Sequence, residues 1–210
     1  MSNESHRPPR IAVLVSGGGR SLENLAEQID LGHLDCELGL VVSDRPKIKA
    51  LDRAHNLGID AVTIPRAEFE NTTVFSTAIF SEIEKRGCEL VVLAGFLRLI
   101  ELPDRWVGRV LNIHPSLLPD FGGKGFYGDH VHSAVLASGK KTSGCTVHYV
   151  TNEYDTGPIL LQRSVQVEAD DDVHKLGSRV FEEEKIALPE AIRSHLSGQV
   201  RFEAGRAVRT

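Results

Sequence analysis

An amide, an imidazole and a carboxylate stand at two separate points of the chain, each next to an apolar segment. Asn112 and His114 belong to the segment NIHPSLLP, and Asp155 begins the tetrapeptide DTGP. We expect the strand at 109–111 to end at a Pro-rich turn, so that Asn112 and His114 leave the sheet toward a ligand. Side chains at i and i+2 of an extended segment share one face. Together with a carboxylate, these groups could transfer a one-carbon acyl unit to an amine.

A glycine-rich loop after the first predicted strand is suited to hold an anion. The loop SGGGRS at 16–21 permits positive φ and lets backbone N–H groups approach an anion at the next helix N-terminus. A dinucleotide-binding loop requires a third glycine where Leu22 stands, and no nucleoside-triphosphate motif follows. A monophosphate therefore fits best, with a simple tight turn as the alternative. Asp44, at the end of the second strand, could bind a ribose hydroxyl or be an ordinary turn residue.

Short β-branched runs alternate with helical patterns along most of the chain, which indicates βαβ units around a mostly parallel sheet. We predict an α/β fold, a single Rossmann-like domain at 10–200 whose twisted sheet is flanked by helices. Residues 1–9 are expected to form a disordered tail and 201–210 a second tail. The predicted strands are 11–15, 38–43, 61–64, 90–94, 146–150 and 159–167, and the predicted helices lie near 22–29, 48–57, 73–85 and 173–196. Because only a turn separates the last two strands, we expect an antiparallel edge in the C-terminal third.

The composition favours small-molecule partners. The chain has 210 residues and a formal net charge of −5, enough length for one domain with a sizeable core and no block of Lys and Arg. Nucleic acid and membranes are therefore not expected partners. Cys36, Cys88 and Cys145 have apolar neighbours and no pairing spacing, so we expect reduced thiols in a cytoplasmic protein. No signal peptide or membrane-spanning run is recognisable. The sequence leaves the oligomeric state open, a homodimer being one option.

Three other chemistries are weaker alternatives. Four histidines could suggest a metal site, but only Asp129 is close enough to support them, and we expect no metal. These are His114, His130, His132 and His148. The tripeptide that begins at Asp155 also occurs in aspartic proteases, which need two copies of it in a β-rich fold. Ser116 lies near His114 and could be a nucleophile, but it follows a proline in a turn.

Over nearly its whole length the sequence resembles the phosphoribosylglycinamide formyltransferase family. The matching segments are LVSGGGRSLENL, VVLAGFLRLI, NIHPSLLP, GCTVHYV, YDTGPILLQ and the late helix that contains Glu184. The wider formyl-transfer superfamily shares Asn112, His114 and Asp155, so these three imply the chemistry alone. The phosphate loop implies the substrate.

This resemblance implies transfer of a formyl group from the co-substrate 10-formyltetrahydrofolate to the amine of glycinamide ribonucleotide, a step of de novo purine biosynthesis. It implies that Asn112 and a protonated His114 stabilise the oxyanion, and that Asp155 raises the pKa of His114. The implied ribonucleotide site consists of Gly17, Gly18, Gly19, Arg20, Ser21 and Glu184. The implied folate site consists of Leu97, Arg98, Leu99, Ile100, Asn112, Thr151, Asn152, Glu153, Tyr154 and Asp155.

The chain departs from the family pattern at the folate tail, where a basic residue is often found and this sequence has Asn71-Thr72-Thr73. Arg66 is a candidate substitute. The glycines at 121–128, with Phe126 and Tyr127, would suit a mobile lid. Other function classes fit less well. A formyltetrahydrofolate hydrolase or a methionyl-tRNA formyltransferase would need a further domain, a non-catalytic binding module could dispense with the three catalytic groups, and a dehydrogenase would need the missing glycine.

Overall fold

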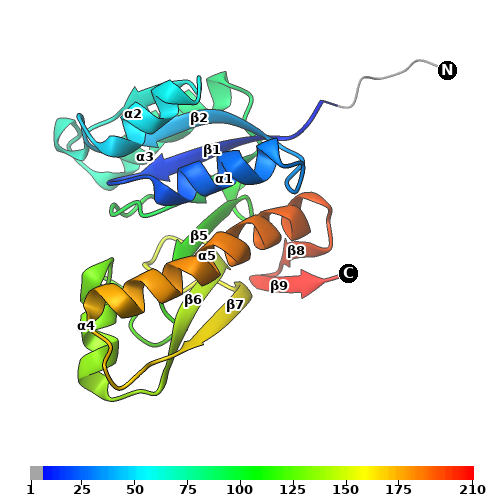
Figure 1. Cartoon of the computed structure of the whole chain (residues 1–210). Helices are drawn as coiled ribbons and strands as arrows, with labels where there is room; N and C mark the ends of the chain where they lie inside the picture. The colour runs from blue at the N-terminus through cyan, green and yellow to red at the C-terminus, as the bar shows by residue number, and fades with distance from the viewer. Residues whose placement is uncertain (1–6) are drawn as a thin grey trace.

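The computed structural model describes residues 7–210 and shows a seven-stranded sheet between helices (Figure 1). Most of the N-terminal tail predicted at 1–9 therefore lies outside the described residues. The strands are β1 (Arg10–Val15), β2 (Glu37–Ser43), β3 (Ala61–Thr63), β4 (Leu90–Leu93), β5 (Val110–His114), β6 (Thr142–Tyr149) and β7 (Ile159–Gln166). The helices are α1 (Arg20–Asp30), α2 (Lys49–Asn56), α3 (Thr72–Lys85), α4 (Asp129–Ser138) and α5 (Val173–Leu196), with short 3₁₀ helices at Arg66–Glu68 and Asp104–Trp106.

The strand order of the sheet is β3-β2-β1-β4-β5-β6-β7. The strands from β3 to β5 pair in parallel, whereas β6 is antiparallel to both β5 and β7. The predicted α/β class, the mostly parallel sheet and the antiparallel edge are confirmed. Within residues 7–210 no helix combines the length and the apolar character that a membrane span requires.

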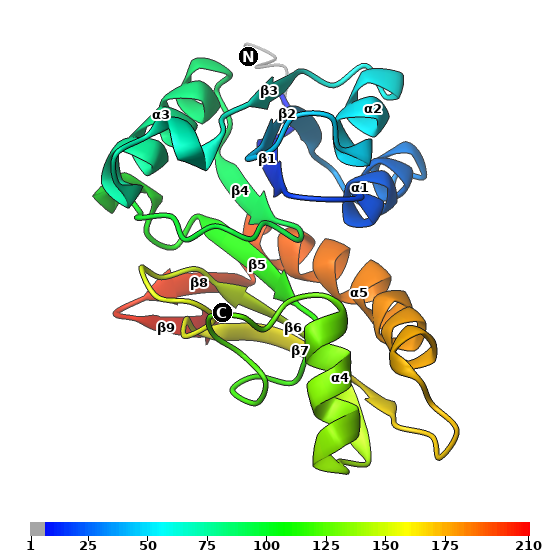
Figure 2. The ribbon, with the colours of Figure 1, turned by 90° about the vertical axis from the view of Figure 1, so that its left-hand side faces the viewer.

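Both faces of the sheet are covered, because successive residues of its central strands point to opposite sides. In β1, Ile11, Val13 and Val15 belong to the core shared with α1, α2 and α5, while Ala12 and Leu14 face the core shared with α3. All five side chains are completely buried. Figure 2 shows α3 on one side of the sheet and α1, α2 and α5 on the other. The continuous apolar run of β1 is therefore the pattern of a central parallel strand.

Strand β5 extends further than predicted, through Asn112 and His114 to its end. Its antiparallel partner β6 supplies the reason, since Asn112 lies opposite His148 and His114 opposite Thr146. The pairing continues the ladder up to the residue before Pro115, so the two side chains project from the last residues of the strand. The expectation that they lie beyond the sheet is wrong.

The prediction of a C-terminal tail at 201–210 is also wrong. Instead, β8 (Val200–Glu203) and β9 (Arg206–Arg209) pair as an antiparallel hairpin. The turn residues Ala204 and Gly205 both have positive φ, 47° and 77°, as tight two-residue hairpins require. Val200 is buried and Phe202 packs on the main core. Together with Ala207 on β9, these side chains attach the hairpin to the core, while its other residues are polar or exposed.

Candidate active site

A cavity of about 710 Å³ opens at the carboxyl ends of β1, β4 and β5. The connections leave β1 and β4 in opposite directions along the sheet, one toward β2 and the other toward β5. Such a switch point is where α/β sheets bind ligands. Helix α5 closes the cavity with residues of its first three turns, from Val173 to Glu184.

The cavity brings together most of the predicted site residues. Those that line it are Gly17, Gly18, Gly19, Arg20, Ser21, Leu97, Arg98, Asn112, His114, Tyr154, Asp155 and Glu184. Leu99, Ile100, Thr151, Asn152 and Glu153 do not line it. The Ile100 side chain is buried in the core on the α3 side, and the Thr151 hydroxyl pairs with that of Thr156 at 2.8 Å. These five predicted folate contacts thus lie beside the cavity.

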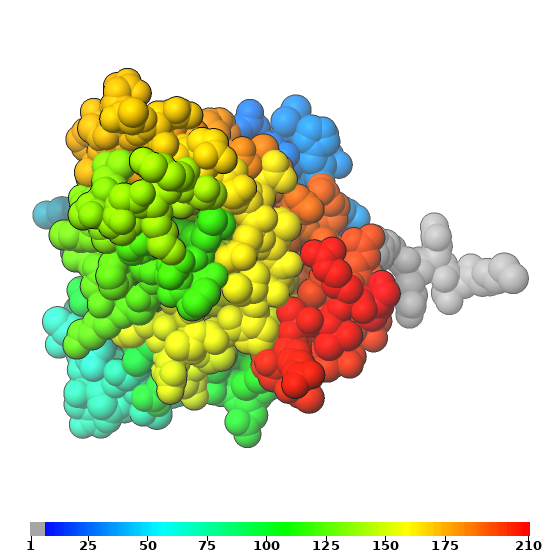
Figure 3. All heavy atoms as spheres, turned by 90° about the horizontal axis from the view of Figure 1, so that it is seen from below, coloured from blue at the N-terminus to red at the C-terminus, as the bar shows by residue number. Residues whose placement is uncertain are grey.

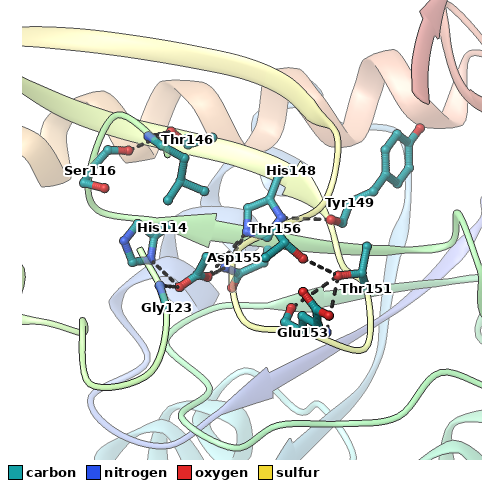
Figure 4. A network of polar contacts seen from close by, with 12 residues as sticks. His114, Ser116, Gly123, Thr146, His148, Tyr149, Thr151, Glu153, Asp155 and Thr156 are labelled. Carbon is teal, nitrogen blue, oxygen red and sulfur yellow. Dashed lines mark hydrogen bonds and ion pairs between the residues drawn. The ribbon is translucent and has the colours of Figure 1, made fainter. Parts of the chain in front are cut away.

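The three predicted catalytic side chains converge on one point although 43 residues separate the amide from the carboxylate. Asn112 Nδ2 lies 3.3 Å from Asp155 Oδ1, and His114 Nδ1 lies 3.6 Å from Asp155 Oδ2. Asp155 has φ 55°, a left-handed conformation that Asp tolerates better than most residues. The Gly123 N–H donates to its Oδ2 at 2.8 Å and fixes the carboxylate (Figure 4).

The imidazole of His114 is almost fully buried, and its two nitrogens have different partners. Nε2 lies 2.8 Å from the Phe121 carbonyl oxygen, which can only accept. In the neutral ring Nε2 therefore carries the proton, and Nδ1 presents a lone pair near Asp155. The backbone of the loop at 121–128 thus selects the tautomer, a contact that the sequence analysis missed.

Burial is the largest influence on the pKa of His114, and it lowers that pKa. Asp155 and the Phe121 carbonyl raise it, while His148 lowers it further. The pKa of Asp155 is also lowered, because contacts with His148, His114 and the Gly123 N–H outweigh the opposing effect of burial. Asp155 acts on His114 in the predicted direction, but the net pKa of His114 lies below its ordinary value. The surroundings of His114 therefore favour its neutral form, contrary to the sequence-based expectation of a protonated ring.

His148, which the sequence offers only as a possible metal ligand, is a further member of this cluster. Its Nε2 lies 3.0 Å from Asn112 Nδ2 and 3.6 Å from Asp155 Oδ1, and its Nδ1 lies 2.8 Å from the Tyr149 carbonyl oxygen. Residues 7–210 contain no group of three or more His, Cys, Asp or Glu side chains arranged to hold a metal ion. His148 therefore orients Asn112. Its position opposite Asn112 in the β5–β6 pairing could have suggested this role.

The glycine loop forms the other end of the cavity. Helix α1 starts after Gly19, which has φ 76°, and no side chain caps the helix N-terminus. Unpaired N–H groups in its first turn can therefore receive an anion. Packing also requires a glycine at position 19, since a Cβ there would lie 2.7 Å from the Cβ of Ala50 on α2. Around Gly17, by contrast, a Cβ would meet nothing within 4 Å.

Charged side chains complete this end of the cavity. The Arg20 guanidinium lies 3.9 Å from the ring centroid of Phe181. Burial raises the pKa of Glu184 to about 7, with Arg20 acting in the opposite direction. Near neutral pH this carboxyl can therefore both donate and accept hydrogen bonds. The backbone N–H groups of the glycine loop and the Glu184 carboxyl thus face one space.

Several residues outside the predicted catalytic, ribonucleotide and folate sets also line the cavity. Helix α4 contributes His132, a buried imidazole whose pKa burial lowers. Gly177 of α5 leaves room for this ring, since a Cβ there would lie 2.9 Å from its Cδ2. Phe126 and Tyr127 line the cavity and remain partly exposed. A glycine within the helical pattern was the available signal for close packing. The mobility of the loop at 121–128 stays a prediction.

Three alternative assignments change in the structure. Asp44 is buried away from the cavity and accepts from Arg98 Nε at 2.7 Å, so it is neither a ribose ligand there nor a simple turn residue. Arg66 donates to the Phe69 carbonyl at 2.7 Å and does not line the cavity. Ser116 donates to the Asp120 carbonyl at 2.6 Å, which occupies the proton that a nucleophile would have to release.

Comparisons with known proteins show the family to which the chain belongs. The profile of the formyl transferase family matches residues 9–192. The chloroplastic phosphoribosylglycinamide formyltransferase of Arabidopsis thaliana is 41% identical over 189 residues, which are 88% of this chain and 65% of that protein. The trifunctional purine biosynthetic protein adenosine-3 of Gallus gallus is 38% identical over 200 residues, 94% of this chain and 19% of that protein. The chain thus spans less than two thirds of these relatives.

A solved structure matches more completely. Glycinamide ribonucleotide transformylase 1 from Symbiobacterium toebii superposes with a TM-score of 0.89 at 37% sequence identity. The match covers 98% of this chain and 95% of that one. The cavity residues, with the glycine loop and the side chains of Asn112, His114 and Asp155, lie within residues 9–192, which the family profile matches.

Proposed function

The chain belongs to the formyl transferase family, and from this membership we propose that it transfers the formyl group of 10-formyltetrahydrofolate to the amine of glycinamide ribonucleotide. The products are formylglycinamide ribonucleotide and tetrahydrofolate, a step of purine biosynthesis. One observation carries the proposal. An anion-binding loop and an amide–imidazole–carboxylate cluster line the same cavity, which suits a phosphorylated substrate whose distant end is an amine.

The ribonucleotide is expected to bind with its phosphate at Gly17–Ser21 and its ribose near Glu184. Backbone N–H groups at the start of α1 complement the phosphate charge. With the phosphate at this end, the glycinamide amine extends toward Asn112 and His114 at the other end of the cavity.

The folate is expected to lie against Leu97, Arg98 and Tyr154, which line the cavity. Its tail would pass near the start of α3, where Thr73 Oγ1 donates to Glu101 Oε2 at 2.6 Å. Residues 71–73 carry no basic side chain, and the nearby Arg66 donates to the Phe69 carbonyl. We therefore expect binding energy for the folate to come chiefly from the ring system.

The reaction starts when the amine nitrogen attacks the formyl carbon and the carbonyl electrons move to oxygen. In the resting site the neutral His114 presents its Nδ1 lone pair, so it can take the proton that the amine loses, directly or through a water held by Asp155. The ring then becomes imidazolium beside an ionised carboxylate and a new oxyanion, both of which favour its charge. A lowered resting pKa suits this use of His114 as a base.

The oxyanion is stabilised by Nδ1–H of the newly charged His114 and by Asn112 Nδ2. The 3.3 Å contact between Asn112 and Asp155 is the longer of the two that Nδ2 makes, and an oxyanion would replace it. The carbonyl re-forms as the bond to folate N10 breaks, and the proton passes from His114 to N10. No covalent bond to the enzyme is needed.

The test mixes purified protein with a 10-formylfolate donor and follows the absorbance of the deformylated folate, with and without glycinamide ribonucleotide. Mass spectrometry then identifies the formylated ribonucleotide. Product that depends on the ribonucleotide supports the proposal. Equal deformylation without it would identify water as the acceptor and a hydrolase as the function. Unreacted donor in both mixtures, with the donor bound, would favour a binding protein.

Three expectations from the sequence stay predictions alongside this function. They are the cytoplasmic location, a domain that spans 10–200, and an assembly that the sequence leaves open, with a homodimer as one option. Sedimentation measurements across protein concentrations would establish the assembly. Small-molecule substrates are what the cavity accommodates, since its volume of about 710 Å³ lies in the usual range for such ligands.

A further inference from the structure

A series of contacts leads from the C-terminal hairpin to the catalytic carboxylate. The hairpin of β8 and β9 lies on the surface beside β6 and β7, where Figure 3 shows it in red next to the yellow strands. None of its residues lines the cavity. Its one large inward side chain is Phe202, which packs on the main core.

Phe202 occupies a space that the chain leaves open for it. A Cβ on Gly108 would lie 2.7 Å from the Phe202 Cβ and 3.0 Å from its ring, so glycine is required there. On its other side the ring packs edge-on against Tyr149, with centroids 5.3 Å apart and planes at 74°. Aromatic pairs of this geometry are favourable beyond the area that they bury. The Phe202 side chain therefore fills the space between Gly108 and Tyr149.

Tyr149 connects Phe202 to the active site. Its side chain is completely buried, and its hydroxyl lies 2.9 Å from His195 Nδ1 on α5. Its carbonyl accepts from His148 Nδ1 at 2.8 Å (Figure 4). Gly157 packs against the same carbonyl, since a Cβ there would lie only 1.7 Å from the oxygen. The position of the Tyr149 backbone thus sets both the His148 ring and the loop that carries Asp155.

The carbonyl also decides which nitrogen of His148 carries the proton. With Nδ1–H donated to Tyr149, the Nε2 of the neutral ring is an acceptor and receives a hydrogen bond from Asn112 Nδ2 at 3.0 Å. The opposite tautomer would place two donors against each other. Asn112 would then turn its amide, and the donor that faces the oxyanion would be lost.

We infer that Phe202 is a positioning residue of the active site, which acts through Tyr149 to hold His148 in the Nδ1–H tautomer and Asp155 in its loop. The kinetic part of this inference rests on the proposed formyl transfer, whereas the tautomer can be measured without any reaction. Misplacement of catalytic groups by about 1 Å can cost up to a hundredfold in rate.

The experiment compares the full chain with Phe202→Ala, with the conservative Phe202→Leu, and with Val208→Ala as a control on the same hairpin. Val208 lies on β9 and is partly exposed. Long-range ¹H–¹⁵N spectra of histidine-labelled protein report which nitrogen is protonated, and His148→Gln identifies the His148 signals. We expect Phe202→Ala to mix the two His148 tautomers and to lower kcat about tenfold, with an unchanged KM for the ribonucleotide. Phe202→Leu should keep most of the wild-type preference for one His148 tautomer and most of the wild-type kcat.

Unchanged His148 spectra and an unchanged kcat in folded Phe202→Ala would overturn the inference and leave Phe202 a purely structural residue. If Phe202→Ala is unfolded at the assay temperature, Phe202→Leu is compared with Val208→Ala instead. The expected changes in the His148 spectra and in kcat are then smaller but have the same direction. A wild-type chain that transfers no formyl group would contradict the proposed function only, because the histidine spectra still decide the positioning role.

Discussion

The two ends of the cavity are built in opposite ways. At the proposed phosphate end the groups available for binding are backbone N–H groups of one continuous loop, Gly17–Ser21, placed by β1 and α1. At the proposed catalytic end they are the side chains of Asn112 and His114 from strand β5 and of Asp155 from the loop after β6, and further polar groups hold them. The first end depends on the shape of the backbone and the second on charge and tautomer. Substitutions should therefore affect substrate binding at one end and turnover at the other.

The largest expected effect is that of His114→Ala, which removes both the base and one oxyanion donor. Turnover should fall by a hundredfold or more, while KM for the ribonucleotide changes little, because the phosphate end is untouched. Steady-state kinetics with His130→Ala as a matched control would measure this, since His130 does not line the cavity. Activity equal to that of the wild type would contradict the mechanism.

Asp155→Asn should lower turnover by roughly ten- to a hundredfold and also move its pH dependence. The carboxylate raises the pKa of His114, so its removal lowers that pKa further. Turnover needs the neutral ring and falls as the pH drops through the His114 pKa. In Asp155→Asn this acid limb should shift to lower pH, which kcat profiles would show. A shift to higher pH, or none, would remove Asp155 from this role.

At the phosphate end, Gly17→Ala and Gly19→Ala form a matched pair that separates ligand binding from packing. The first adds a methyl group to open space and should raise KM for the ribonucleotide severalfold with little change in stability. The second adds one at φ 76° and 2.7 Å from Ala50 Cβ, which should cost about 1–3 kcal/mol in the free energy of unfolding. Kinetics and denaturant titration would test both. Loss of folate binding alone in Gly17→Ala would contradict the phosphate assignment.

The smallest expected effect is that of Glu184→Gln. The pKa of Glu184 is raised from 4.5 to about 7, so between these values the folded protein holds a proton that the unfolded chain has lost. The contribution of Glu184 to stability therefore declines as the pH rises through this window. Glu184→Gln should melt a few degrees above the wild type at pH 8, and the difference should close toward about pH 4. The exposed Glu182→Gln serves as the control, and an equal shift in it would contradict the assignment.

Local sequence predicted the parallel part of the fold well because each βαβ unit has its own hydrophobic period. The helix predicted at 173–196 has those bounds in the structure, and the predicted bounds of β1 and α3 differ by one residue. Helix α4 was missed, since its few buried positions give little periodicity. The C-terminal hairpin was missed because only three of its side chains, Val200, Phe202 and Ala207, pack on the core.

The sequence by itself determined the types and order of the chemical groups: an anion loop after the first strand, then an amide and an imidazole two residues apart, then a carboxylate. Spacing and glycine content carry this information, because they act within a few residues. Only the tertiary structure decided that His148 lies opposite Asn112, that the Phe121 carbonyl holds His114 Nε2, and that burial lowers the His114 pKa. Register and desolvation arise when distant segments pack together, and no local pattern encodes them.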